Sequence, residues 1–149
     1  MIKVEHSVVI NRATEEVFAF LTNFENNSQW QSGIIETRQT PQSLTGVGTT
    51  VREVRQFMGR QIDATGEIIE YEPDSKICLK SISGPFQFKG SYTLESVEGG
   101  TKLAVVFEVQ LSGFFRLAQS MVARELSKQI EADFSNLRVM LEAQGQRGT

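Results

Sequence analysis

The chain has 149 residues, a net charge of −3 at pH 7, and charges of both signs that are spread along its length. This length suits one domain with a sizeable core, and the mixed charges argue against a basic surface for nucleic acid. The single cysteine, Cys78, excludes an internal disulfide, and with only one histidine we expect neither a metal site nor a cofactor.

Residues 2–10 predict a half-buried first strand. They read IKVEHSVVI, with apolar side chains and His6 on one face and mostly polar side chains on the other. The chain does not begin with the basic and apolar segments of a signal peptide, and no apolar run reaches the roughly 18 residues of a membrane span. We therefore expect a cytoplasmic protein without an integral membrane segment.

A short helix is predicted after this strand, within residues 11–24. Thr14 is a candidate N-cap, and Glu15 and Glu16 suit the positive end of the helix dipole. Helical spacing gives an apolar stripe made of Val17, Phe18, Leu21 and Phe24. The polar run ENNSQ follows, and the only tryptophan, Trp30, comes directly after it.

The middle of the chain predicts an antiparallel meander. Its segments are rich in β-branched and aromatic residues and are separated by turn signals at Gly59-Arg60, Pro73-Asp74, Gly84-Pro85 and Gly99-Gly100. Short turns between consecutive strands favour antiparallel pairing. The segments are IIETRQT (34–40), TTVREVRQFM (49–58), QIDATGEIIEYE (61–72), SKICLKSIS (75–83), FQFKGSYTLESV (86–97) and TKLAVVFEVQL (101–111).

One long helix is predicted from residue 112 to about residue 143. This stretch contains no proline, and its one glycine is Gly113. A helix of about 30 residues is roughly 45 Å long and can cover the apolar face of the sheet. We expect residues 1–144 to form a single domain and residues 145–149 to be a flexible tail. The apolar arc of the helix consists of Phe115, Val122, Leu126, Ile130, Leu137, Met140 and Leu141.

This order of elements predicts an α+β fold, a curved antiparallel β-sheet wrapped around a long C-terminal helix, with two short helices after the first strand. The segments VEHSVVINRATEEVFAFLTNFENNSQWQSGI and GSYTLESVEGGTKLAVVFEV, with the terminal helix, resemble the helix-grip superfamily. This superfamily is also called START-like, Bet v 1-like or SRPBCC. Within it, the chain is most similar to the polyketide cyclase/dehydrase and lipid-transport group. Because the superfamily includes cyclases, lipid carriers, hormone receptors and chaperone cofactors, the resemblance implies a fold more than an activity.

The resemblance also implies a cavity. It places the short helices beneath the open end of the sheet, where Trp30 would plug or line that end; the alternative is that Trp30 only packs in the core. Gly66 and Gly90 stand in mid-strand among apolar residues, where glycine permits a bend and leaves volume unfilled. The alternative for both glycines is a bulge or a close approach of the helix.

Polar residues on the predicted inner surfaces also point to a hollow. Asp133 falls within the apolar arc of the helix and Gln129 lies one turn earlier. A carboxylate in a dry core is costly unless it is paired. Asp133 therefore faces a wet or ligand-filled space, or bonds an Arg or Tyr of the sheet. Gln129, Asp133, Tyr92 and His6 are the candidate polar groups of a pocket, although His6 also fits a core position.

We expect the cavity to bind or carry a hydrophobic small molecule, such as a lipid, a polyketide or an aromatic compound. The alternatives are a polyketide cyclase or dehydratase that uses acid/base groups of the same cavity, and a protein-interaction module of the same fold. No catalytic residue is assigned. The expected ligand-binding residues are Trp30, Phe57, Phe88, Tyr92, Phe107, Val122, Leu126, Gln129 and Asp133.

Other polar and reactive residues have simpler interpretations. Cys78 lies in a strand and is expected to be a buried small residue. Arg52, Glu53 and Arg55 are interpreted as a solvated strand face. The turn at Met58-Gly59-Arg60 is a hairpin tip that could gate the mouth of the cavity.

Overall fold

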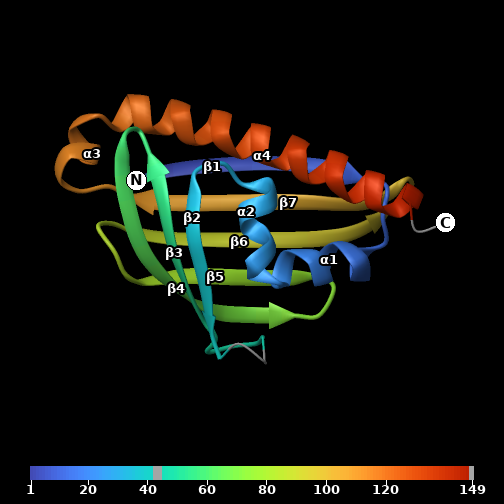
Figure 1. Ribbon diagram of the computed structural model, residues 1–149. Coiled ribbons are helices and arrows are strands. Elements are labelled where there is room, and N and C mark those ends of the chain that lie inside the picture. The colour runs from blue at the N-terminus through green and yellow to red at the C-terminus, as the bar shows by residue number, and fades with distance from the viewer. Residues whose placement is uncertain (42–44, 148–149) are drawn as a thin grey trace.

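The computed structural model describes residues 1–41 and 45–147 and shows a curved sheet with a long helix lying across its concave face (Figure 1). In chain order the elements are β1 (Ile2–Ile10), α1 (Thr14–Thr22), the 3₁₀ turn η1 (Phe24–Asn26), α2 (Asn27–Trp30), β2 (Ile34–Thr40), β3 (Thr50–Phe57), β4 (Arg60–Glu72), β5 (Lys76–Ser83), β6 (Gln87–Val97), β7 (Gly100–Gln110), α3 (Gly113–Leu117) and α4 (Gln119–Arg147). None of these helices combines the length and the apolar content that a membrane span needs.

The sheet is antiparallel and has the order β1-β7-β6-β5-β4-β3-β2. Strands β2 to β7 follow one another as a meander, and β1 pairs with β7 so that Ile2 faces Val109 and Ile10 faces Thr101. The short helices follow β1 directly; α1 lies against β6 and β7, and α2 lies against β2 and α4 (Figure 1). The α+β architecture expected from the sequence is therefore confirmed.

Bulges and aromatic rings, more than empty space, explain the mid-strand glycines. The register of β4 against β5 shifts next to Gly66, and bulges of this kind bend a sheet. A Cβ at Gly90 would lie 3.3 Å from the Phe107 ring, and one at Gly66 would lie 3.4 Å from Phe88. Gly90 thus makes room for a ring of the neighbouring strand β7, and Gly66 makes room for a ring of β6, two strands away.

The terminal helix departs from its prediction at both ends. A turn at Ala118 separates α3 from α4, where the sequence predicts one continuous helix. The buried Phe115 of α3, which the helical periodicity placed on the apolar arc, packs against Phe57 of β3 and against Phe86 just before β6. At the other end, α4 continues through Arg147, beyond its expected end near residue 143, while residues 148–149 lie outside the described part.

The start of α1 corrects another expectation. The N-cap is Ala13, which makes no side-chain cap, and Thr14 is already the first helical residue. The Thr14 hydroxyl donates to the carboxylate of Glu15 at 3.2 Å instead of capping the helix. Just before the helix, Arg12 pairs with Glu16 and donates to the carbonyl oxygen of Leu141 at 2.6 Å, which ties the start of α1 to the end of α4.

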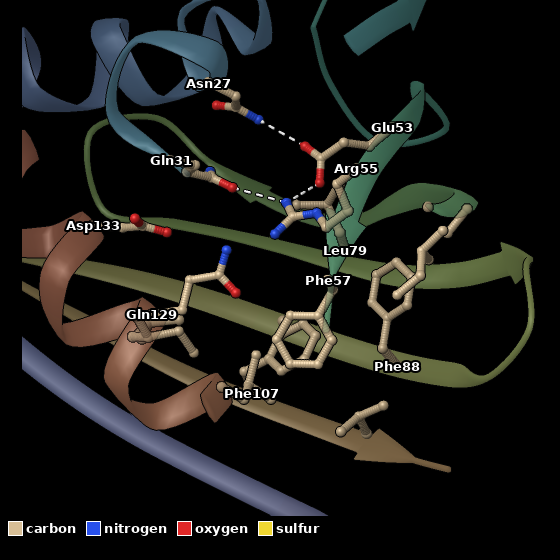
Figure 2. Close-up of a pocket in the computed structure, with 18 of the residues that line it drawn as sticks. Asn27, Gln31, Glu53, Arg55, Phe57, Leu79, Phe88, Phe107, Gln129 and Asp133 are labelled. Atoms are coloured by element: carbon tan, nitrogen blue, oxygen red, sulfur yellow. Dashed lines mark hydrogen bonds and ion pairs between the residues drawn. The ribbon is translucent and has the colours of Figure 1, made fainter. Parts of the chain in front are cut away.

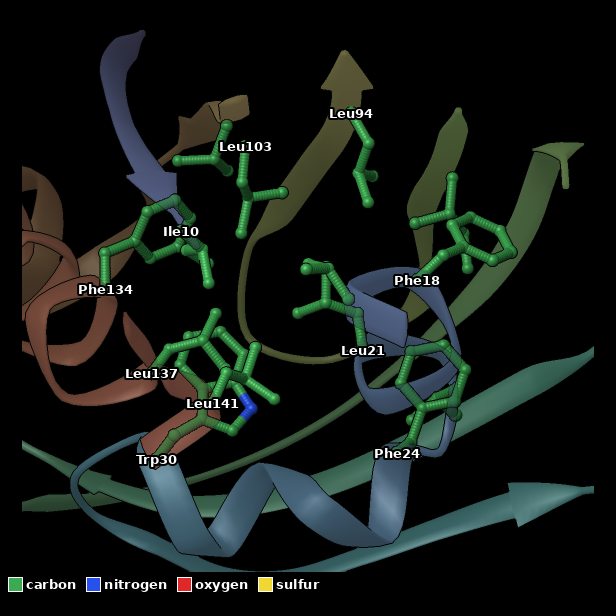
Figure 3. Close-up of a cluster of buried hydrophobic side chains, with 14 of the residues drawn as sticks. Ile10, Phe18, Leu21, Phe24, Trp30, Leu94, Leu103, Phe134, Leu137 and Leu141 are labelled. Atoms are coloured by element: carbon green, nitrogen blue, oxygen red, sulfur yellow. The ribbon is translucent and has the colours of Figure 1, made fainter. Parts of the chain in front are cut away.

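The C-terminal half of α4 forms the main core together with α1, α2 and the sheet (Figure 3). Leu137 and Leu141 are essentially inaccessible and lie with Ile10 and Leu103 of the sheet. The N-terminal half of α4 contributes Val122 to a second cluster. The helix is therefore anchored along its second half, which leaves its first half to border the space described below.

Leu137→Ala tests this anchoring. We expect it to lower the free energy of unfolding by about 2–5 kcal/mol, because the side chain is fully buried and its removal leaves a hole. Val139→Ala, on the exposed side of the same helix, is the matched control and should change stability by about 0.5 kcal/mol or less. Urea unfolding measures both, and equal effects would contradict the assignment of the core.

Candidate functional site

A cavity of about 220 Å³ lies between the concave face of the sheet and α4 (Figure 2). Side chains of β3, β4, β5, β6, β7, α2 and α4 form its walls. All nine residues named from the sequence lie on these walls, although their contact with a ligand stays a prediction. They are Trp30, Phe57, Phe88, Tyr92, Phe107, Val122, Leu126, Gln129 and Asp133.

Aromatic rings line one end of the cavity. Phe88 of β6 stacks on Phe107 of β7 with ring centres 5.8 Å apart. Phe115 of α3 closes this end against Phe57 and Phe86. Phe88 and Phe107 are among the residues that the sequence predicts for the cavity, and Phe115 belongs to the predicted apolar arc. This end offers a ligand only apolar surface.

A polar cluster on β3 and α2 occupies the other part of the cavity, and it corrects the sequence interpretation. Glu53 and Arg55 point inward and form an ion pair, with their side chains 21% and 24% exposed. Arg55 Nη2 also donates to Gln31 Oε1 at 2.9 Å, and Asn27 Nδ2 donates to Glu53 Oε2 at 3.3 Å (Figure 2). Only Arg52, of the three residues interpreted as a solvated face, is exposed.

The pairing in β3 explains why Arg52 differs from its neighbours. Successive side chains of a strand point to opposite faces. Arg52 therefore lies on the outer face, where it forms a bidentate pair with Asp63 of β4 at 3.0 and 2.7 Å. Val51 and Phe57 share the inner face with the ion pair. The apolar Val51 and Phe57, at alternate positions with Glu53 and Arg55, were the one local sign in the sequence that this face of β3 points inward.

α4 contributes Gln129 and Asp133 to the polar part of the cavity. The backbone N–H of Ser32 donates to Asp133 Oδ1 at 3.1 Å. Gln129 Nε2 donates to the Ser32 carbonyl oxygen at 2.9 Å and to its hydroxyl at 3.0 Å. Asp133 thus bonds the segment after α2, and not an Arg or Tyr of the sheet as one of the alternatives had it.

Burial shifts the acidity of two cavity groups. Desolvation raises the pKa of Asp133 above its ordinary value, against the opposing effect of the hydrogen bonds from Ser32 and the charge of Arg55. Desolvation, and to a smaller extent the charge of Glu53, raises the pKa of Tyr92 to about 12. Tyr92 therefore keeps its proton near neutral pH and can act as a hydrogen-bond donor.

Trp30 combines both roles that the sequence allowed. It is 3% exposed, packs against Phe134 of α4 with ring centres 5.9 Å apart, and also borders the cavity. Its indole N–H is enclosed and has no hydrogen-bond partner among the described residues. His6 does not line the cavity, which removes it from the candidate polar groups. Its ring meets Phe134 edge-on, with ring centres 5.5 Å apart.

A surface groove adjoins the cavity between the β3–β4 turn and α4. Phe57 and Gln129 border both spaces, which identifies them as the rim between cavity and groove. The turn residue Met58 lines the groove opposite Met121, Glu125 and Lys128 of α4. The hairpin tip predicted at Met58 therefore lies at the mouth of the cavity.

Other reactive groups lie away from this site. Cys78 is fully buried in β5, where its sulfur accepts a hydrogen bond from Ser91 at 3.2 Å. Within the described ranges, no three His, Cys, Asp or Glu side chains come together in a way that could hold a metal ion.

Comparisons with known proteins agree with this architecture. A family model described as polyketide cyclase/dehydrase and lipid transport matches residues 1–142. Similar solved structures include TTHA0849 from Thermus thermophilus, with a TM-score of 0.82, 18% identity, and coverage of 95% of this chain and 97% of that chain. No curated protein matches the sequence.

Some of the similar structures carry names that describe an activity. The Zhui aromatase/cyclase from Streptomyces sp. R1128 has a TM-score of 0.74 and 15% identity, over 94% of this chain and 93% of that one. The di-domain ARO/CYC StfQ from the steffimycin biosynthetic pathway has a TM-score of 0.78 and 12% identity, over 99% of this chain and 52% of its own. At these identities the likeness shows a shared fold.

Asp133→Asn tests the electrostatics of the cavity. Because the pKa of Asp133 is raised in the folded protein, its ionised form costs stability at neutral pH, and this cost disappears as pH falls through the raised pKa toward the ordinary value of 3.8. We expect the asparagine variant to be more stable than wild type at pH 7 and the difference to shrink toward pH 4. Urea unfolding across this pH range measures the difference. Glu131→Gln, on the exposed side of α4, is the control, and a difference for Asp133→Asn that grows on acidification would contradict the assignment.

Proposed function

Since the chain belongs to the polyketide cyclase/dehydrase and lipid-transport family, we propose that it binds a hydrophobic small molecule between the sheet and α4. One observation carries this proposal: the concave face encloses a cavity of about 220 Å³ whose walls are mostly apolar. Concave, largely apolar sites with a few placed polar groups are the usual form of small-molecule sites.

The cost of an empty cavity supports an occupant. At about 24 cal/mol per Å³, an empty apolar space of this size costs on the order of 5 kcal/mol, a large part of a domain's stability. Water can satisfy the polar part of the cavity, but the ring-lined end offers it no hydrogen-bond partners. An apolar body at the ring-lined end would recover the contacts that an empty cavity loses.

The size of the cavity indicates the size of the ligand. An apolar cavity of about 150 Å³ holds a benzene ring. The present cavity is larger and continues into the groove at Phe57 and Gln129, so it suits about two fused rings or a short acyl chain.

Blocking the cavity from α4 tests the binding proposal. Leu126 lines the cavity and Ser127 is exposed next to it, so Leu126→Trp fills the space while Ser127→Trp adds the same side chain outside. We expect wild type and Ser127→Trp to bind 1-aminonaphthalene with Kd values within about twofold of each other, and Leu126→Trp to raise the Kd about tenfold or more. The measurement is the blue shift of the probe's emission on titration with protein.

Native mass spectrometry of the purified protein gives an independent check, because a co-purified ligand adds mass to wild type and to Ser127→Trp but not to Leu126→Trp. The proposal fails if the probe binds all three proteins equally. It also fails if wild type neither binds the probe nor retains a ligand.

A cyclase or dehydratase activity is the second candidate, favoured by two titratable groups in the same cavity. Asp133 has a raised pKa, and Tyr92 stays protonated near neutral pH. A carboxylate that exchanges its proton and a hydroxyl that polarises a carbonyl oxygen are what an aldol-type ring closure requires. The similar structures named as aromatase/cyclases add support from the fold.

The activity has its own test. If the protein cyclises a poly-β-keto thioester, Tyr92→Phe and Asp133→Asn should each lower kcat by about 10²–10⁴-fold while binding of 1-aminonaphthalene changes little. Product formation is followed by liquid chromatography and mass spectrometry. Equal turnover by wild type and both variants, or none by wild type, would exclude this role and leave binding unaffected.

A further inference from the structure

The guanidinium of Arg55 is only partly satisfied by the protein. Both of its hydrogen bonds, to Glu53 and to Gln31, leave from the same nitrogen, Nη2. An arginine has five N–H donors, and those on Nε and Nη1 have no protein partner in residues 1–41 and 45–147.

These free donors remain open to the cavity. Among described side chains that are not exposed, only Trp30 Nε1 and Thr37 Oγ1 are fully enclosed without a partner, so the remaining N–H groups of Arg55 keep access to open space. Arg55 lines the cavity, and Figure 2 shows its guanidinium directed inward, toward Gln129 and Asp133 on the opposite wall. A ligand in the cavity meets these donors directly.

Tyr92 supplies a second donor to the same region. Tyr92 of β6 lines the cavity, and its ring stacks on Phe134 of α4 with ring centres 6.2 Å apart. None of the hydrogen bonds found among the described residues uses the Tyr92 hydroxyl. Arg55 of β3 and Tyr92 of β6 therefore both present unused donors to the cavity.

The charge balance determines which acceptor suits these donors. Glu53 already neutralises Arg55, and Asp133 adds a second carboxylate on the opposite wall. A carboxylate on the ligand would bring a third negative charge into a half-buried site with a single cation, where charges are poorly screened. An uncharged oxygen accepts the same hydrogen bonds without that repulsion.

We propose that Arg55 is the specificity-determining residue of the cavity and that its free N–H groups, with the Tyr92 hydroxyl, bind a carbonyl oxygen on an uncharged ring compound. Glu53 and Gln31 are positioning residues that hold the guanidinium in place, and Asn27 holds Glu53. The protein thus selects a cyclic ketone over both the corresponding hydrocarbon and the corresponding carboxylate. This inference rests on the proposed small-molecule binding and names the chemistry of the ligand.

Three two-ring probes of nearly equal shape test it: tetralin, 1-tetralone and 1,2,3,4-tetrahydro-1-naphthoate. Competition against 1-aminonaphthalene measures the Kd of each for wild type and for Glu53→Gln/Arg55→Met, which removes the ion pair without leaving a lone charge. We expect the affinity for tetralone relative to tetralin to fall about tenfold or more in the double variant, the size of one hydrogen bond from a charged donor. The Kd of tetralin itself should change by less than about threefold.

Two further variants serve as controls for this comparison. Arg52→Met/Asp63→Asn removes the bidentate ion pair from the outer face of the same strands and should leave the tetralone-to-tetralin ratio unchanged. Arg55→Lys keeps the charge opposite Glu53 but loses the free fork of donors, so we expect an intermediate ratio. This variant also keeps the test valid if the double variant does not fold, as judged by circular dichroism.

Each outcome separates the two proposals. Equal ratios for wild type, the inner-face double variant and Arg55→Lys would overturn the role of Arg55, while tetralin binding would still support the cavity. Tightest binding of the carboxylate by wild type would overturn the charge-balance reasoning. No binding of any probe by wild type would overturn the proposed function, and the inference with it.

Discussion

A width mismatch between sheet and helix is the constraint on which this structure depends. A sheet of seven strands spaced about 4.8 Å apart presents a concave face several times wider than one helix, whose diameter is about 10 Å. The single long helix α4 cannot cover such a face. The segments α1, η1 and α2 cover part of the remainder, and the uncovered part becomes the cavity. A hollow is thus a consequence of this arrangement of elements.

The two halves of α4 have different roles. Its second half is fixed by Leu137 and Leu141, which are packed with the sheet and the short helices. Its first half borders the cavity with Val122, Leu126 and Gln129. Core packing at one end therefore positions side chains at the other, and the binding space can vary without loss of the anchoring contacts.

The inward-facing ion pair is costly for a protein that only needs to fold. Removing two charges from water costs several kcal/mol per ion, and their attraction often does no more than offset this cost. Glu53 and Arg55 nevertheless lie half-buried in the cavity, held by Asn27 and Gln31 from α2 and the residue after it. Such a cluster at one side of an otherwise apolar cavity favours one orientation of a bound ligand, because a single polar group on the ligand pairs best with the cluster.

The sequence by itself determined the architecture and the apolar lining of the cavity. Alternation along β4, β6 and β7 predicted which side chains face inward, because a half-buried strand repeats its pattern every two residues. The long amphipathic stretch after them predicted the helix that covers the sheet. The same pattern did not assign the faces of β3, because both faces of this strand carry polar residues. The sequence alone therefore does not distinguish the environment of Arg52 from that of Arg55. Only the tertiary structure decided that Arg55 points inward, that Asp133 bonds Ser32, and that a turn at Ala118 interrupts the predicted helix. These features depend on contacts between residues far apart in the chain, which local periodicity does not contain.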